Sequence, residues 1–298
     1  MTKSFELCGV IVPLVTPFQK GGEVVDEGAM AALSEWLISK GVHGLMPCGT
    51  TGEGPLLTTD ERMRLLEVTL GAANGRVPVI AHVGAATTRE TILLAKHAEA
   101  NGIQAISMVT PYYFPVSLQT MVEHYCRVAD AVPDTTVYLY NIPSRTVNNF
   151  TRAGAAAVIE RCPNVMGVKD SSGNLENTLS FVGLKDGKFQ VACGSDSLVF
   201  QAIQQGAVAC VSGNSNAYPE VTVAMFEAFW RGDLAAAARQ QEILDVVRNA
   251  LMNGSDLSLL KRAVEYRGIP AGAVRPPLLD FDMALWPAVE SQLAPLAL

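Results

Sequence analysis

Histidine and cysteine are scarce in this sequence, and neither is arranged as a metal or disulfide site requires. The 298 residues include four His and six Cys, with no Cys-x-x-Cys pair and no His-Glu-x-x-His pattern. Scattered cysteines in mostly apolar surroundings are typical of reduced thiols, which indicates a cytoplasmic protein. The dispersed histidines do not predict a metal site.

Long apolar runs and an excess of positive charge are also lacking. No run reaches the roughly 18 residues of a transmembrane helix, and no basic segment precedes an apolar stretch near the N-terminus, so neither a membrane span nor a signal peptide is predicted. Lys and Arg number 22 against 29 Asp and Glu, a formal net charge of -7. This balance argues against nucleic acid or an anionic membrane as a partner. A small anionic substrate stays compatible, because a few local donors can outweigh the overall field.

The sequence does contain a regular alternation of short apolar runs with helical patterns. The apolar runs are continuous, as in parallel strands that are covered on both faces. Strands are predicted at residues 10–15, 44–47, 78–82, 105–109, 136–141, 164–170, 190–193 and 209–212. Helices are predicted at residues 27–40, from 59 onward, and at 88–100, 118–132 and 151–161. Such β–α repeats with short connections predict a (β/α)8 TIM barrel, an α/β fold.

The remainder of the chain is helical in pattern and has no strand-like run. Helices are predicted at residues 221–231, 234–252 and 255–267, followed by a turn-rich end. We therefore predict a barrel domain of residues 1–218 and a C-terminal α-helical extension of residues 219–298 that packs on the barrel. The hydrophobic content of 49% is sufficient for a large core.

Lys169 is the first candidate for chemistry, because active sites of such barrels lie at the carboxyl ends of the strands. It follows the apolar run of strand 164–170, and a lysine is almost never fully buried unless another group pairs with it or uses it. Burial penalises the ammonium form, and a neutral amine can condense with a 2-oxo acid to form an imine, which acts as an electron sink. The alternatives are a salt bridge with Asp170 and a lysine on the surface.

Tyr140 and Arg145 belong to the preceding strand, residues 136–141, and to the loop that follows it. The Tyr140 phenol could shuttle protons to and from the carbonyl oxygen as an imine forms, or it could be a core aromatic with a satisfied hydroxyl. Arg145 could bind a carboxylate bidentately or lie on the loop surface. Two neighbouring strands that each end on a proton-handling residue suggest a Schiff-base active site.

A Gly-rich turn at residues 49–54 follows the second predicted strand. Its backbone amides and the hydroxyls of Thr50 and Thr51 would suit a substrate carboxylate. The turn is not a phosphate-binding P-loop, because no Gly-Lys-Ser/Thr follows, and it lacks the dinucleotide fingerprint. No cofactor is therefore expected, and a turn of this kind does not identify a site by itself.

Together these residues resemble the dihydrodipicolinate synthase/N-acetylneuraminate lyase family of class I Schiff-base aldolase-type barrels. The resemblance runs essentially end to end, from residues 9–13 to residues 275–278. Four motifs carry it: Gly49-Thr50-Thr51-Gly52-Glu53, Thr110-Pro111-Tyr112-Tyr113, Tyr140-Asn141-Ile142-Pro143-Ser144-Arg145-Thr146 and Gly167-Val168-Lys169-Asp170.

The resemblance implies a catalytic set and an assembly. Lys169 would form the imine with pyruvate or a related 2-oxo acid. Tyr140 would be the central acid/base and would relay protons through Thr50. Tyr113 would complete this relay from the neighbouring subunit, across a tight dimer interface. The implied assembly is a homotetramer, a dimer of such dimers.

The resemblance also implies how the substrates are held. Thr51, with its backbone amide, would bind the carboxylate of the 2-oxo acid, and Gly194 and Val211 would line the pocket near bound pyruvate. Arg145 matches the position that grips the carboxylate of the aldehyde in the synthase, which condenses pyruvate with aspartate semialdehyde in lysine biosynthesis. For this reason the synthase is the leading interpretation.

Three features resemble instead the aldolases and dehydratases of the family that act on 2-keto-3-deoxy sugar acids. They are Phe114 after the tyrosine pair, the loop of residues 212–220, and the helix of residues 257–263, which lacks an Asn-Pro-rich lead-in. These features concern the aldehyde or sugar-acid partner and leave the imine chemistry unchanged. Two alternatives from other classes are a barrel that only binds a small ligand and a metal-dependent aldolase.

Overall fold

The computed structural model describes residues 5–296, and their eight strands form one sheet in the order β2-β1-β8-β7-β6-β5-β4-β3. The strand pairs described are parallel. The strands are β1 (Gly9–Pro13), β2 (Gly44–Met46), β3 (Ile80–His82), β4 (Ala105–Val109), β5 (Thr136–Asn141), β6 (Val165–Asp170), β7 (Gln190–Cys193) and β8 (Ala209–Val211). This sequential order, with helices between the strands, confirms the predicted (β/α)8 barrel.

The helices follow the predicted ranges closely wherever they are long. They are α1 (Glu27–Ser39), α2 (Thr59–Ala73), α3 (Thr88–Ala100), α4 (Leu118–Ala131), α5 (Pro143–Thr146), α6 (Arg152–Arg161), α7 (Leu175–Ser180), α8 (Val199–Gln204), α9 (Pro219–Trp230), α10 (Leu234–Ala250), α11 (Leu257–Tyr266) and α12 (Trp286–Leu293). The sequence did not predict α5, α7 and α8, because four to six residues are too few for a helical period to be recognised. Helix α12 lies in the segment that was predicted to be turn-rich.

Local polar groups define where several of these helices begin. The Thr58 hydroxyl accepts from the Glu61 N–H at 3.2 Å, and the Glu61 carboxylate accepts from the Thr58 N–H at 2.8 Å, which forms a capping box at α2. The Thr87 hydroxyl caps α3 by accepting from the Glu90 N–H, and the Ser117 hydroxyl caps α4 by accepting from the Thr120 N–H. The first residues of α2, α3 and α4 are therefore set by side chains close by in the sequence.

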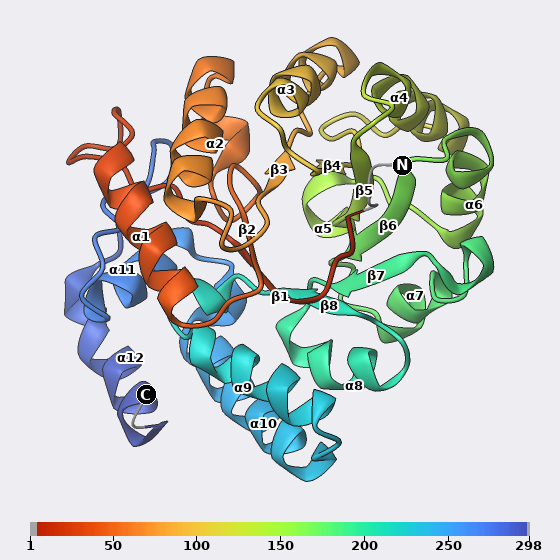
Figure 1. Ribbon diagram of the computed structural model, residues 1–298. Coiled ribbons are helices and arrows are strands. Elements are labelled where there is room, and N and C mark those ends of the chain that lie inside the picture. The colour runs from red at the N-terminus through yellow and green to blue at the C-terminus, as the bar shows by residue number, and fades with distance from the viewer. Residues whose placement is uncertain (1–4, 297–298) are drawn as a thin grey trace. The chain divides into compact units, whose positions relative to one another are not determined.

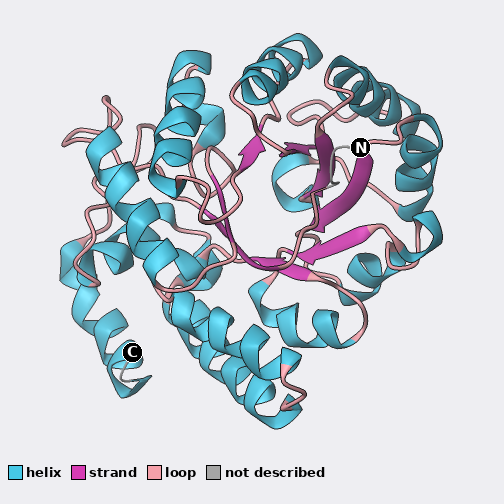
Figure 2. Ribbon diagram, viewed as in Figure 1, coloured by secondary structure: helices cyan, strands magenta, loops and turns pink. Residues whose placement is uncertain are grey.

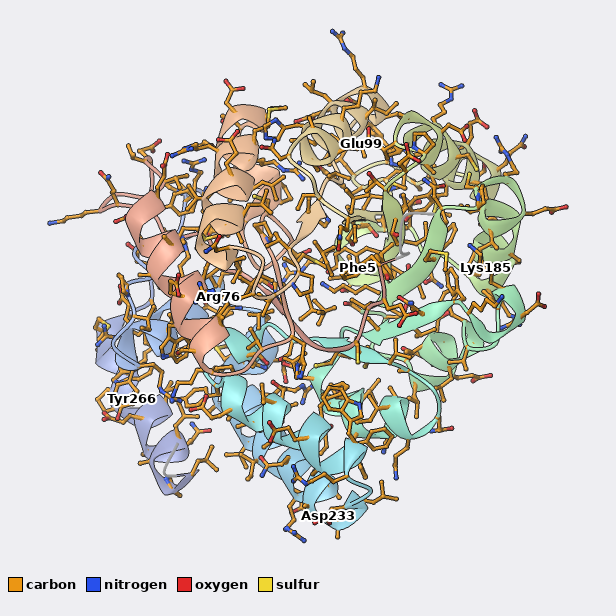
Figure 3. The ribbon with its side chains drawn as sticks, viewed as in Figure 1. Phe5, Arg76, Glu99, Lys185, Asp233 and Tyr266 are labelled. Atoms are coloured by element: carbon orange, nitrogen blue, oxygen red, sulfur yellow. The ribbon has the colours of Figure 1, made fainter. Side chains whose placement is uncertain are left out.

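The chain divides into two compact units, one of Met1–Cys8 with Val79–Val211 and the other of Gly9–Pro78 with Ser212–Leu298. We call them the first and the second unit. In the first unit, α3, α4 and α6 lie along the outside of strands β3 to β6 (Figures 1 and 2). Phe5 lies near these strands (Figure 3), where its ring meets that of Tyr138 edge to face at 6.0 Å. The Leu7 N–H donates to Gln190 at 2.8 Å, so this segment is tied to the amino end of β7.

In the second unit, α9 and α10 pack side by side, as do α1 and α2 (Figure 1). Among the helices of residues 5–296, none combines the length and the apolar character of a membrane span. The predicted boundary between residues 218 and 219 stays a prediction. The outer ends of the two predicted domains, residues 1–4 and 297–298, lie outside the described residues.

Candidate active site

Lys169 lies one residue before the end of β6, directly opposite Tyr140 of β5 in the parallel ladder. Lys169 is 6% exposed. The amine nitrogen lies 3.9 Å from the centroid of the Tyr140 ring, so the two side chains share one face of the sheet. The neighbours that the sequence predicted are therefore in contact, and the lysine is not a surface residue.

Asp170, the next residue, has its side chain on the opposite face, because successive side chains of a strand alternate. The carboxylate is fully buried and accepts four hydrogen bonds from neutral groups. The donors are Asn141 at 2.8 Å, Asn177 at 2.9 Å, Ser172 at 2.6 Å and Thr178 at 2.6 Å. Both carboxylate oxygens thus have partners near the start of α7. Among residues 5–296, no carboxylate forms an ion pair with the Lys169 amine.

Gly194 follows β7 beside the lysine. Its N–H donates to the Asp170 carbonyl at 2.8 Å. A Cβ at this position would lie 3.2 Å from Cε of Lys169 and 2.0 Å from the hydroxyl oxygen of Ser171. A side chain here would require the Ser171 hydroxyl to move and would crowd the Lys169 side chain. Val211, another predicted pocket residue, is buried at the end of β8.

Tyr140 is itself buried, with the ring of His82 edge to face at 5.9 Å. Two buried cysteines, Cys193 at the end of β7 and Cys48 after β2, would be nucleophiles only as thiolates. Burial raises the pKa of Cys193, before Gly194, to about 12, and burial likewise raises the pKa of Cys48 to about 12. Both groups therefore stay protonated thiols near neutral pH.

The loop after β4 presents two exposed aromatic rings. Tyr113 is 81% exposed and Phe114 is 68% exposed, and their rings meet edge to face at 4.9 Å. Tyr113 has a φ of 74°, a left-handed conformation that is a genuine outlier for a bulky residue. Strained residues of this kind cluster at functional sites.

Asn148 holds this loop, although the sequence analysis did not identify it. Its buried amide nitrogen donates to the carbonyls of Pro111 at 2.7 Å and Phe114 at 2.9 Å, and its oxygen accepts from the Val116 N–H at 2.9 Å. Asn148 therefore links the loop that carries Tyr113 to the segment after α5. Arg145 lies on α5 and is exposed.

Thr50 and Thr51 belong to the second unit, in a compact turn after β2. The turn is closed by hydrogen bonds from the Gly52 and Gly54 N–H groups to the Gly49 carbonyl, at 3.1 and 3.0 Å. Both threonines are partly exposed, whereas Glu53 is buried. The predicted Gly-rich turn is thus present as a defined backbone structure.

Within the described part of the chain, no group of three or more His, Cys, Asp or Glu side chains is arranged to hold a metal ion.

The sequence model of the Dihydrodipicolinate synthetase family matches residues 6–295, nearly the whole chain. The chain belongs to the dihydrodipicolinate synthetase family.

Individual members of the dihydrodipicolinate synthetase family are similar over almost their full lengths. A DapA-like lyase of Halobacterium salinarum, described as uncharacterized, is 39% identical over 98% of this chain and 95% of its own. The 4-hydroxy-tetrahydrodipicolinate synthase of Acidiphilium cryptum is 37% identical over 91% of each chain. These relatives are named as synthases or lyases, and this chain is a lyase.

Solved structures agree with the barrel. A dihydrodipicolinate synthase superposes with a TM-score of 0.90 at 30% identity, covering 98% of this chain and 99% of its own. YagE from E. coli K12, a prophage protein of the dihydrodipicolinic acid synthase family solved in complex with pyruvate, has a TM-score of 0.93 at 30% identity, covering 99% of this chain and 100% of its own.

The sequence did not predict the hydrogen bonds of Asp170 and Asn148, two buried residues next to the predicted site. Asp170 was considered only as a salt-bridge partner of Lys169, although the alternation of strand side chains could have placed it on the other face. Asn148 has no comparable signal, because its partners lie on a loop more than thirty residues earlier in the chain.

Proposed function

We propose that this lyase forms a Schiff base between Lys169 and a pyruvate-type 2-oxo acid, and that it makes or breaks a carbon–carbon bond next to the imine. The leading candidate is the 4-hydroxy-tetrahydrodipicolinate synthase reaction of lysine biosynthesis, between pyruvate and aspartate semialdehyde. The observation that carries the proposal is the buried Lys169 amine, 3.9 Å from the Tyr140 ring and without a carboxylate partner in the described residues. The name of the Acidiphilium relative and the pyruvate complex of YagE also support it.

The first step is addition of the Lys169 nitrogen to the C2 carbonyl carbon. The carbonyl oxygen takes one proton from Tyr140 and one that comes from the amine, and it leaves as water. The protonated imine then withdraws electrons from C3, so that a C3 proton or a bond to C4 can break. Thr50 and Tyr113 relay the protons that Tyr140 gives and receives, with Tyr113 supplied by a neighbouring subunit.

The remaining predicted residues bind the substrates in this proposal. Thr51 and its backbone amide hold the carboxylate of the 2-oxo acid, and Arg145 grips the carboxylate of the aldehyde. Gly194 and Val211 line the pocket beside the imine. The absence of a side chain at Gly194 supports this role, because a Cβ would approach Cε of Lys169.

Reductive trapping tests the imine. The protein is incubated with pyruvate and borohydride and its intact mass is measured, because reduction turns an imine into a permanent adduct. We expect one adduct per chain in the wild type and in Lys188→Met, whose lysine is exposed, and none in Lys169→Met. A wild type without adduct, or an adduct that persists in Lys169→Met, would contradict the proposal.

A second candidate function is cleavage or dehydration of a 2-keto-3-deoxy sugar acid. The exposed ring of Phe114 beside Tyr113 favours it, because an apolar ring is a poor partner for the charged aspartate semialdehyde. A panel of aspartate semialdehyde with pyruvate, against several 2-keto-3-deoxy acids, separates the candidates.

Arg145→Ala refines this test. If Arg145 pairs with the aldehyde carboxylate, the variant should lose about 2–5 kcal/mol of transition-state stabilisation with aspartate semialdehyde. Full synthase turnover in the variant would exclude that role for Arg145.

We also propose a homotetramer built from two tight dimers, in the cytoplasm. The exposed Tyr113 and Phe114 rings support an interface at this loop, because adjacent exposed aromatic residues mark interaction sites. All six cysteines are free, which supports a reducing compartment. Sedimentation velocity of the wild type and Tyr113→Ser tests the assembly, and we expect the variant to dissociate more readily.

A further inference from the structure

Glu53 ends the Gly-rich turn of the second unit in an unusual state. Its φ is 55°, in the left-handed region that non-glycine residues rarely adopt, and its carboxylate is buried. One carboxylate oxygen lies 2.5 Å from the Lys261 amine, and the other accepts from the Arg275 N–H at 2.8 Å. Neither the imine chemistry nor the substrate contacts proposed above use this carboxylate.

Lys261 comes from α11, whose last residue, Tyr266, is labelled in Figure 3. Its amine is buried, donates to the Ala273 carbonyl at 2.6 Å and lies 4.5 Å from the centroid of the Phe18 ring. Burial lowers the pKa of Lys261, and the neighbouring Glu53 carboxylate opposes that shift. Removing two charges from water costs free energy, and additional hydrogen bonds to each charge help to offset that cost. The Ala273 carbonyl provides one for Lys261, and the Arg275 N–H provides one for Glu53.

Arg275 fixes the other side of the Glu53 carboxylate. Its guanidinium binds the carboxylate of Glu61 bidentately, with both distances 2.7 Å, and donates to the Leu56 carbonyl at 3.0 Å. Glu61 also closes the capping box of α2. The segment of residues 273–275 therefore holds the turn and the beginning of α2 together.

We propose that the buried Glu53–Lys261 pair positions the turn of residues 49–54 for the carboxylate of the 2-oxo acid. The inference rests on the proposed function of that turn, and it gives the C-terminal helices a part in substrate binding. The Glu53 N–H donates to the Thr50 carbonyl at 3.2 Å, so the backbone of Glu53 and that of Thr50 move together.

Two physical effects connect the pair to the substrate. The ion pair holds Glu53 in its left-handed conformation, and without it the turn is free to relax toward a more favourable φ. Lys261 also neutralises the Glu53 carboxylate, which would otherwise repel an anionic substrate held by the same turn. Loss of Lys261 therefore weakens binding of the 2-oxo acid more than it slows the chemistry on Lys169.

The test measures the rate of borohydride trapping against pyruvate concentration. In Lys261→Met we expect the half-saturating pyruvate concentration to rise at least about tenfold, the effect of losing a hydrogen bond to a charged group. The trapping rate at saturation should change far less. Arg262→Met is the matched control, because Arg262 is the next residue of α11 and pairs with Glu265 at 3.2 Å on the part-exposed face. It should behave as the wild type.

The double variant Glu53→Gln/Lys261→Met covers the case in which Lys261→Met does not fold. Removing both charges is far less destabilising than removing one. We expect its thermal stability to recover while its half-saturating pyruvate concentration stays raised, because the turn has lost its anchor. If either folded variant binds pyruvate as the wild type does, the pair has only a structural role. If the wild type forms no adduct, the proposed function fails, and the inference fails with it.

Discussion

At the scale of single residues, the last two side chains of β6, Lys169 and Asp170, lie on opposite faces of the sheet, because side chains of a strand alternate. Lys169 faces the ring of Tyr140, while Asp170 on the other face is bound by four neutral donors. The two side chains are adjacent in sequence, yet they do not form an ion pair with each other. The hydrogen bonds of Asp170 tie β5, β6 and α7 together.

The Asp170 network predicts a specific loss of stability. Asp170→Ala removes the acceptor of four hydrogen bonds, of which those from Asn141 and Thr178 are buried, so we expect the free energy of unfolding to fall by about 3 kcal/mol. Asp170→Asn keeps one acceptor oxygen and should lose less. Urea unfolding measures both, with the exposed Asp134→Ala as the unchanged control. Equal stability of Asp170→Ala and Asp134→Ala would contradict this account.

At the scale of elements, loops that follow neighbouring strands are joined by side chains and not by secondary structure. The loop after β4 contains a tyrosine with positive φ, and the amide of Asn148 spans it through three backbone groups. Thr110, at the start of the loop, donates to the hydroxyl of Thr146 at 2.9 Å. The position of Tyr113 thus depends on the segment that follows β5.

Asn148→Ala should loosen this loop while the barrel stays folded. We expect hydrogen exchange of the Val116 amide to accelerate at least about tenfold, because its acceptor is removed and the opening free energy falls by about 1.5 kcal/mol or more. Turnover should fall as well if Tyr113 relays protons. Asn101→Ala, on the surface end of α3, is the control. Unchanged exchange at Val116 would show that other contacts hold the loop.

At the scale of the whole molecule, acid stability depends on groups that fold in an uncharged form. His124 of α4 is buried, its Nδ1 lies 2.9 Å from the Thr88 hydroxyl oxygen, and burial lowers its pKa to about 4. An unfolded chain has a histidine pKa near 6.5 and therefore binds more protons than the folded chain between these values. The contribution of this site to stability is complete above pH 6.5 and is lost as the pH falls toward 4.

We therefore expect the free energy of unfolding to decline between pH 6.5 and pH 4, with His124 adding up to about 1.4 kcal/mol per pH unit. His124→Gln should show a shallower decline over this range and the same slope above pH 7. Urea titrations at fixed protein concentration provide the measurement, because association of subunits would otherwise change the apparent stability. Identical slopes in both proteins would show that folding does not lower the pKa of His124.

The sequence by itself determined the barrel, the ranges of its longer helices and the pairing of Tyr140 with Lys169. These features depend on signals that are local along the chain: continuous apolar runs, helical periodicity, and the rule that parallel strands present their carboxyl ends together. Only the tertiary structure decided which groups hold those residues. The donors of Asp170, the loop bound by Asn148 and the pair of Glu53 with Lys261 join segments far apart in the chain, and hydrogen bonds between distant segments leave no periodic pattern in the sequence.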